Sequence, residues 1–185
     1  MRKTMFAVGL MLVVATFMAC VDSVTSPSLV GKWTSDSIKT VEDGGTMMKL
    51  YKFAFNEDST MTLLVDASME SSSEGVSIYM PFSIDVAAKW CDKDSVLIWV
   101  PADSAVNVKL NADSMKMTFD KPEMEALGDK MKKSMVESFE KEGKNEFAAG
   151  YNKSDTVKYV LDGDKLTLYI DEDTVKLTRE AAPQK

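Results

Sequence analysis

The sequence predicts a mostly β fold, an up-and-down antiparallel β-barrel of about eight to ten strands with one amphipathic helix inserted before the last strands. From Leu29 onward, apolar and polar residues alternate in short segments, which is typical of strands that turn one face to a core. Turns rich in Asp, Asn and Ser separate these segments, and strands joined by such short turns must be antiparallel neighbours. One segment instead has apolar residues three and four positions apart, as a helix requires.

The first 19 residues are predicted to be a signal peptide. Arg2 and Lys3 give a basic start, and the apolar run of residues 5–19 is shorter than the roughly 20 residues that cross a bilayer. The end of this stretch, Phe17 to Cys20, resembles the lipobox of bacterial lipoproteins, where the Cys is acylated and becomes the first mature residue. The resemblance implies that Cys20 is lipidated, with acyl chains such as palmitate. An ordinary secretory signal with an incidental Cys is the alternative.

The chain after the signal is predicted to be a tether followed by one domain. Residues 20–28 contain Ser, Thr, Asp and Pro27 with little to bury, which indicates a flexible tether. Residues 29–185 are long enough for one domain with a sizeable core. In some enteric bacteria an Asp directly after the acylated Cys keeps a lipoprotein at the inner membrane, but here Val21 follows Cys20. By that resemblance we expect the outer membrane of the cell envelope, on either face.

Charge and composition restrict the partners and the chemistry. Without Arg2 and Lys3, 20 of the 22 Lys and Arg residues remain against 29 Asp and Glu, a net charge of −9. Such an acidic chain has no electrostatic reason to bind nucleic acid or anionic lipid. The lipid anchor alone is therefore expected to attach the protein to the membrane. The chain has no His, which removes Ser-His-Asp and Cys-His nucleophile pairs and common zinc sites. We therefore expect no enzyme, no cofactor and no metal, and the sequence indicates no particular protein partner.

The clearest strand is the segment from Val76 to Trp90, whose even-numbered residues are apolar and are expected to point inward. Pro81 cannot donate a hydrogen bond to a neighbouring strand, so we expect a bend, a bulge or a break there. Further strands are expected at Leu29–Thr40, Met47–Phe55, 61–65, 96–100, 106–110, 115–119, 157–161, 166–170 and 175–177.

The acidic turns are predicted to be hairpin turns, because Asn and Asp tolerate left-handed backbone and bond their own main chain. Calcium loops are the alternative. The best match to an EF-hand begins at Asp162, but Leu166 and Thr167 occupy positions where a ligand and a glycine are needed. We therefore predict no calcium site.

The helix is predicted at about residues 121–143. Asp120 and Glu123 resemble a capping box, and Pro122 falls in the first turn, where a missing N–H costs nothing. Gly143 marks the expected end. The apolar stripe is expected to pack on the barrel rather than on a membrane surface; its residues are Met124, Leu127, Met131, Met135 and Phe139.

The first expected strand begins with the sequence Leu-Val-Gly-Lys-Trp, residues 29–33, which contains a Gly-X-Trp motif. A Gly-X-Trp motif at the start of an antiparallel meander, directly after a lipobox, resembles the lipocalins and especially small bacterial lipocalin-like lipoproteins. In that family the Trp closes one end of the barrel and a basic residue of the last strand packs across it. The resemblance implies that Trp33 and Arg179 form such a contact, worth roughly 0.5–2 kcal/mol as a cation–π pair.

Two functions remain open from the sequence. The first is a lipocalin-like module that binds a small apolar ligand in the barrel mouth, since a barrel of about eight strands can hold one small ligand. Its expected lining residues, each of which could equally be plain core, are Tyr51, Phe53, Met80, Phe82, Trp99 and Tyr159. The second is a filled barrel that acts as a structural or inhibitor-type protein-interaction lipoprotein. An apolar cavity of roughly 300 Å³ or more would favour the first.

Overall fold

The structure is a computed structural model that describes residues 29–42, 45–170 and 173–181. The expected signal peptide, the tether and Cys20 lie outside these residues. The strands are β1 (Gly31–Ser35), β2 (Ile38–Glu42), β3 (Gly45–Phe55), β4 (Thr60–Ser73), β5 (Val76–Lys93), β6 (Val96–Leu110), β7 (Lys116–Phe119), β8 (Asp155–Asp162), β9 (Lys165–Ile170) and β10 (Asp173–Arg179). The helical segment runs through α2 (Pro122–Ser138), a π-helical turn (Phe139–Gly143) and α3 (Lys144–Tyr151), and a 3₁₀ turn (Ala112–Ser114) precedes β7.

Eight strands form a closed antiparallel barrel, as predicted. They follow each other in chain order, β1, β3, β4, β5, β6, β8, β9 and β10. β1 closes the barrel because it pairs with β10 on one side and with β3 on the other. Closure of this kind removes the free edges of a sheet.

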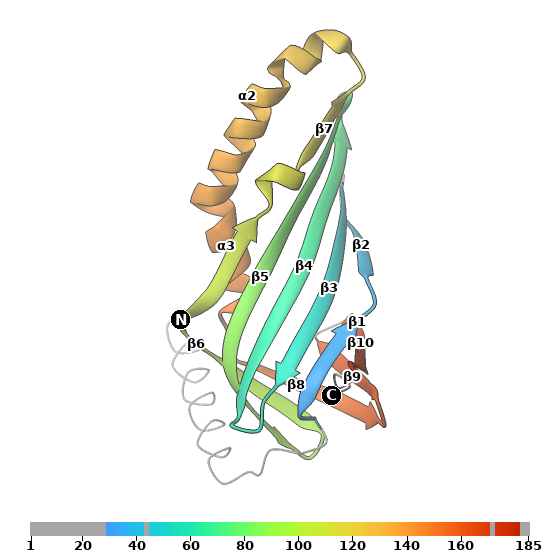
Figure 1. Cartoon of the computed structure of the whole chain (residues 1–185), viewed down its shortest axis with the longest axis vertical. Helices are drawn as coiled ribbons and strands as arrows, with labels where there is room; N and C mark the ends of the chain where they lie inside the picture. Colours follow the sequence, from blue (N-terminus) through green and yellow to red (C-terminus); the bar gives the residue numbers. More distant parts are fainter. Residues whose placement is uncertain (1–28, 43–44, 171–172, 182–185) are drawn as a thin grey trace, which may run out of the picture.

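Three of the barrel strands continue beyond the barrel, which the sequence did not predict. β1 pairs only with residues 52–55 of β3, whereas β2 pairs with residues 45–49. In the same way β6 pairs with residues 82–93 of β5, whereas β7 pairs with residues 76–79. The ends of β3, β4 and β5 that lie outside the barrel pair with β2 and β7 and form a smaller sheet. We call it the sheet extension; it is seen above the barrel in Figure 1. The expected single strand 29–40 is accordingly split into β1 and β2.

β5 confirms the predicted alternation but not the predicted break at Pro81. Even-numbered residues from Met80 to Trp90 are buried, while Ser77 is exposed and Ser83 and Asp85 are half-buried. The strand is continuous through Pro81, whose carbonyl oxygen accepts a hydrogen bond from the Asn111 N–H at 2.9 Å. The backbone nitrogen of Pro81, which has no hydrogen, points to the same side of β5 as its carbonyl. On that side β6 has ended and β7 has not yet begun, so no hydrogen bond between strands is lost. The irregularity lies further on, between residues 86 and 88.

The helix begins and ends differently from the prediction. Its N-cap is Lys121, which makes no side-chain capping bond, so the expected capping box is absent. It continues past Gly143 to Tyr151, because the ring of Phe147 packs against Phe82 and Phe139 with ring centres 4.6 and 5.9 Å apart. Gly143 does not stop the helix; a Cβ atom there would lie 3.0 Å from the Phe139 ring, so the glycine makes room for that ring.

The helix covers the molecule unevenly. Phe139 is buried in the core, as predicted, whereas Leu127 is 49% exposed and the methionines of the stripe are half-buried. The N-terminal half of α2 lies beside β7, along the sheet extension rather than over the barrel (Figure 1). No helix within the described residues is both long enough and apolar enough to cross a membrane.

Candidate functional site

One end of the barrel is held by Trp33 and Arg179, which face each other on β1 and β10. The expected contact is present: the Arg179 guanidinium carbon lies 4.1 Å from the centre of the Trp33 ring. The Trp33 indole is fully buried and donates a hydrogen bond to the Leu29 carbonyl at 2.8 Å. An Arg179 Nη1 hydrogen bond to the Val30 carbonyl, at 2.6 Å, fixes the guanidinium from the other side.

Gly31 explains why the motif needs its glycine. Its φ of +134° belongs to a region that residues with side chains rarely adopt. A Cβ atom at this position would lie 2.7 Å from Nη1 of Arg179. The glycine therefore admits the guanidinium that covers Trp33, and the Gly-X-Trp motif and Arg179 form one structural unit.

A cavity of about 410 Å³ lies inside the barrel wall, where the end of α3 and the residues that follow it approach the strands. We call it the barrel cavity. Phe53, Leu63 and Val86 lie on adjacent strands in register and supply one layer of its wall. The apolar residues that line it are Phe53, Met61, Leu63, Val86, Trp99 and Ile170.

Two tyrosines supply the polar part of the barrel cavity. Tyr51 comes from β3 and Tyr151 from the last residue of α3. Burial raises the pKa of the Tyr151 hydroxyl, and its hydrogen bond with the Tyr51 side chain raises that pKa further. The Tyr151 phenol therefore stays neutral at physiological pH and can donate or accept a hydrogen bond. Lys153 and Asp155 line the same cavity and bring charged groups to it.

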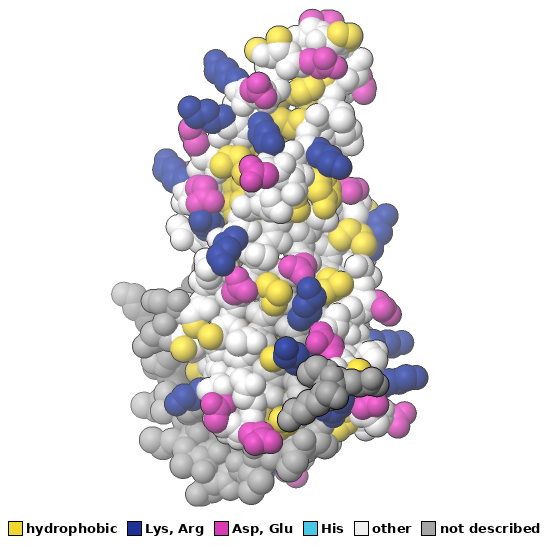
Figure 2. Space-filling view, in the orientation of Figure 1, with side chains coloured by type: hydrophobic (Ala, Val, Ile, Leu, Met, Phe, Trp, Pro, Cys, Tyr) yellow, Lys and Arg dark blue, Asp and Glu magenta, His cyan; other side chains and the backbone are white. Residues whose placement is uncertain are grey.

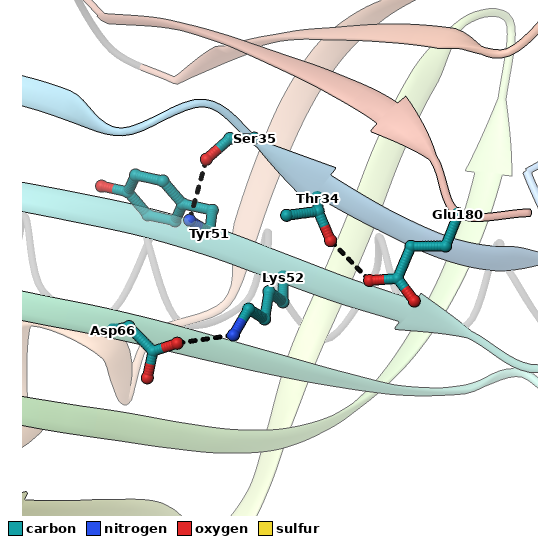
Figure 3. Close-up of polar contacts among 6 residues, drawn as sticks. All are labelled: Thr34, Ser35, Tyr51, Lys52, Asp66 and Glu180. Carbon is teal, nitrogen blue, oxygen red and sulfur yellow. Dashed lines mark hydrogen bonds and ion pairs between the residues drawn. The ribbon is translucent and has the colours of Figure 1, made fainter.

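The backbone of Tyr51 is fixed by Ser35, a polar residue buried to 4% exposure. Its Oγ accepts a hydrogen bond from the Tyr51 N–H at 2.9 Å, just beyond the last β1–β3 pair, Thr34 with Lys52. Figure 3 shows this bond, with Lys52 on the other face of β3 paired to Asp66 at 2.6 Å. The serine thus replaces the strand partner at the point where β1 leaves β3, and it holds Tyr51 at the cavity.

The structure brings together three of the six residues expected to line a ligand site: Tyr51, Phe53 and Trp99. Phe82 instead packs against Phe139, with ring centres 5.8 Å apart. Met80 lies in a separate groove between the helix and the sheet extension. These two residues were expected at the mouth because they share a face of β5 with Val86, but β5 is so long that they belong to a different part of the molecule.

Tyr159 lies elsewhere in the core. Its hydroxyl donates a hydrogen bond to Asp92 at 2.9 Å, and burial followed by that bond raises the pKa of the phenol. Its backbone N–H bonds the Ser95 carbonyl at the β5–β6 turn, which places it away from the residues of the barrel cavity.

Sequence reasoning missed Tyr151, because the helix was expected to end at Gly143. The signal that could have found it is the continuation of the apolar stripe from Phe139 through Phe147 to Tyr151, at spacings of eight and four residues, which keep one helical face. No group of three or more His, Cys, Asp or Glu side chains in the part of the chain that the structure describes could hold a metal ion.

No protein-family model matches the chain, and no curated protein matches it in sequence.

Proposed function

We propose that the protein is a cell-envelope lipoprotein whose barrel binds a small apolar molecule without changing it chemically. The observation that carries this proposal is the barrel cavity, whose volume of about 410 Å³ falls within the roughly 300–1,000 Å³ range of small-molecule sites. A filled barrel with a purely structural or inhibitory role would have no use for such a cavity, so the cavity supports the ligand-binding alternative.

The lining indicates the kind of ligand. Six of the twelve lining residues are apolar, so displacing water from them drives part of the binding. The Tyr51–Tyr151 pair offers hydrogen bonds, and Lys153 and Asp155 add charged groups, which suits a largely apolar molecule that also carries polar groups. A water molecule occupies about 30 Å³ of liquid, so the cavity has room for on the order of a dozen groups of that size.

The lipocalin resemblance supports the same function. Gly31, Trp33 and Arg179 form the contact that this resemblance implies, and their geometry depends on all three. The barrel is closed and up-and-down, as in lipocalins. We infer that the chain is a lipocalin-like protein and acts as a binding module, with no catalytic residue, no cofactor and no nucleic-acid partner.

The anchor rests on the sequence. The basic start, the short apolar run and Ala19-Cys20 support export and lipidation at Cys20. We propose that the acyl chains hold the protein at the outer membrane, because a single chain would bind only reversibly. The acidic domain then faces an aqueous compartment and has the barrel cavity free to take up its ligand.

A fluorescent apolar probe, N-phenyl-1-naphthylamine, tests binding at the barrel cavity. We expect saturable binding with one probe per chain. A Cβ atom built at Gly150 meets no heavy atom within 4 Å, so Gly150→Phe has room to place a ring at the cavity mouth. Val86→Phe fills the cavity from the wall. Both should weaken probe binding, while Ala149→Phe, on the neighbouring exposed residue, should not. Equal binding by all four proteins would refute the proposal.

A further inference from the structure

Methionine is distributed very unevenly in this protein. Ten of the 14 methionines lie after the expected signal peptide, and all of these except Met61 belong to the sheet extension, to the approach to β7 or to α2. Figure 2 shows hydrophobic side chains exposed on this part of the surface and also further down, over the barrel. Apolar packing alone does not require one residue type, since aromatic residues, Leu, Ile and Val fill most of the barrel core.

Three of these methionines form a row across the sheet extension. Met47 on β3 is directly opposite Met69 on β4, and Met69 is directly opposite Met80 on β5. Directly opposed residues have Cβ atoms about 4.5–5.5 Å apart on one face of the sheet. Met80 is buried at 5% exposure, while Met47 and Met69 are half-buried and pack against the core cluster.

A fourth methionine approaches this row from the helix. Met69, Met80 and Met135 of α2 line one groove of about 580 Å³ between the helix and the sheet extension, which we call the thioether groove. Phe139 and Phe147 complete its apolar lining, and Glu142 and Glu146 also line it. No Lys or Arg is among its lining residues.

We propose that Met69, Met80 and Met135 bind a soft monovalent cation of the Cu(I) class in the thioether groove, with Met47 next to them as a further thioether. Thioether sulfur selects Cu(I) over the harder divalent ions, which prefer oxygen and nitrogen ligands. The arguments against calcium and zinc in this chain concern those other ligands and do not apply to sulfur. Glu146 adds negative charge near the cation without having to bind it, and Glu142 does so in part, since it also forms an exposed ion pair with Lys141 at 3.8 Å.

Flexibility and partial exposure suit this role. A methionine side chain has three rotatable bonds, so sulfurs from two strands and a helix can adjust around one ion. The groove is open to solvent on one side, which gives the ion a path of entry. This site is separate from the barrel cavity, and its failure would leave the proposed ligand binding untouched.

Silver(I) is a suitable probe, because it has the charge and softness of Cu(I) and is stable in air. The full-length chain, purified in detergent with ¹³C-labelled methionine methyl groups, is titrated with Ag⁺ and followed by NMR. The methyl resonances of Met69, Met80 and Met135 should shift together and saturate. Met48, on the outer face of β3, and Met61, in the barrel, are internal controls that should not shift. Zn²⁺ should shift none of them.

Variants supply the second arm of the test. Met69→Leu, Met80→Leu and Met135→Leu conserve volume and retain the fold. Each should weaken Ag⁺ binding, read from the remaining methyl shifts, by at least about tenfold, the lower limit for losing even an outer-shell metal partner. Met48→Leu should have no effect. Titrations in which no methionine resonance moves, or in which Met48 moves as much as Met69, would show that the groove is only an adaptable apolar surface and would overturn the proposal.

Discussion

Arg179 covers Trp33 from the last strand of the barrel, with its guanidinium carbon 4.1 Å from the ring centre, although Val30 and Arg179 are 149 residues apart in the chain. The contact combines a cation–π interaction, a hydrogen bond to the Val30 carbonyl and an ion pair with Asp164 at 3.2 Å. Because the Asp164 side chain is 78% exposed, the ion pair adds little, and the first two interactions dominate.

Replacing the arginine therefore has a measurable cost. Arg179→Ala should lower the free energy of unfolding by about 1–3 kcal/mol, because both the ring contact and the carbonyl's donor are lost. Urea unfolding followed by Trp fluorescence measures this. Arg179→Lys should recover only part of the loss, since an ammonium group lacks the planar guanidinium. Lys176→Ala, an exposed change on the same strand, is the control; an equal effect of the two alanine variants would contradict the role of Arg179.

Gly31 should be as sensitive as its partner. Gly31→Ala places a Cβ atom 2.7 Å from Nη1 of Arg179 and strains a backbone φ of +134°. We expect a loss of about 1–3 kcal/mol in the free energy of unfolding. The double variant with Arg179→Ala should lose less than the sum of the two single variants, because the clash disappears. Strictly additive losses would mean that the two residues do not act as a unit.

Alkaline pH should destabilise the fold through Tyr151. Burial raises the pKa of this phenol above its usual value near 10. At pH values between the usual pKa and the raised one, the unfolded state has lost the phenolic proton while the folded state keeps it. The free energy of unfolding should then fall with rising pH above about 10, by up to about 1.4 kcal/mol per pH unit. Tyr151→Phe should reduce this slope in urea unfolding curves but not abolish it, because the raised pKa of Tyr159 contributes a slope of the same sign. Thr178→Ala, an exposed change without a titrating group, should leave the slope as it is.

Phe82 and Tyr51 separate core packing from ligand binding. Phe82 packs on Phe139 and Phe147 and is buried, so Phe82→Ala should cost about 3–5 kcal/mol of stability. The affinity of the remaining folded protein for the naphthylamine probe should not change.

Tyr51→Phe keeps the ring and should leave the free energy of unfolding within about 1.5 kcal/mol of the unmodified protein, the usual net contribution of one hydrogen bond. It should nevertheless change the affinity for a probe with a polar end. The reverse pattern would place the ligand outside the barrel cavity.

Lipidation can be tested at the residue that the lipobox resemblance implies. Cys20→Ala should leave the precursor unprocessed or release the protein into the soluble fraction, because no acyl chain can be attached. Membrane fractionation followed by immunoblotting checks this, with Ser23→Ala as the matched control. Normal membrane retention and normal processing of the Cys20→Ala variant would exclude the lipoprotein hypothesis.

The sequence predicted the parts of the fold that depend on local pattern. Period-two alternation identified the inward face of β5, and short Asx turns implied an antiparallel meander. It could not predict the lengths of pairing. Pro81 is accommodated in a continuous strand because β6 ends beside it and β7 begins after it, and residues far away in the chain determine where those two strands pair.

The candidate site was half predicted for a similar reason. Tyr51, Phe53 and Trp99 were found because they alternate inward on barrel strands. Tyr151 was missed because Gly143 read as a helix stop, whereas packing against Phe139 makes a glycine necessary inside the helix. The role of Gly143 depends on a tertiary contact, which rules based on the local sequence cannot predict.

The pairing of β1 with β10 also dictates when the barrel can form. Contacts of such long sequence separation make folding slow, because a long loop must close before they form. If the chain is exported from its N-terminus, as proposed above, β10 is delivered last, and β1 keeps one unpaired edge until export is complete. Until then, the edge of β1 is open to pairing with other chains. An exported protein of this design would benefit from an envelope chaperone that shields its first strand, and a chain truncated before Asp173 should aggregate rather than persist as a smaller barrel.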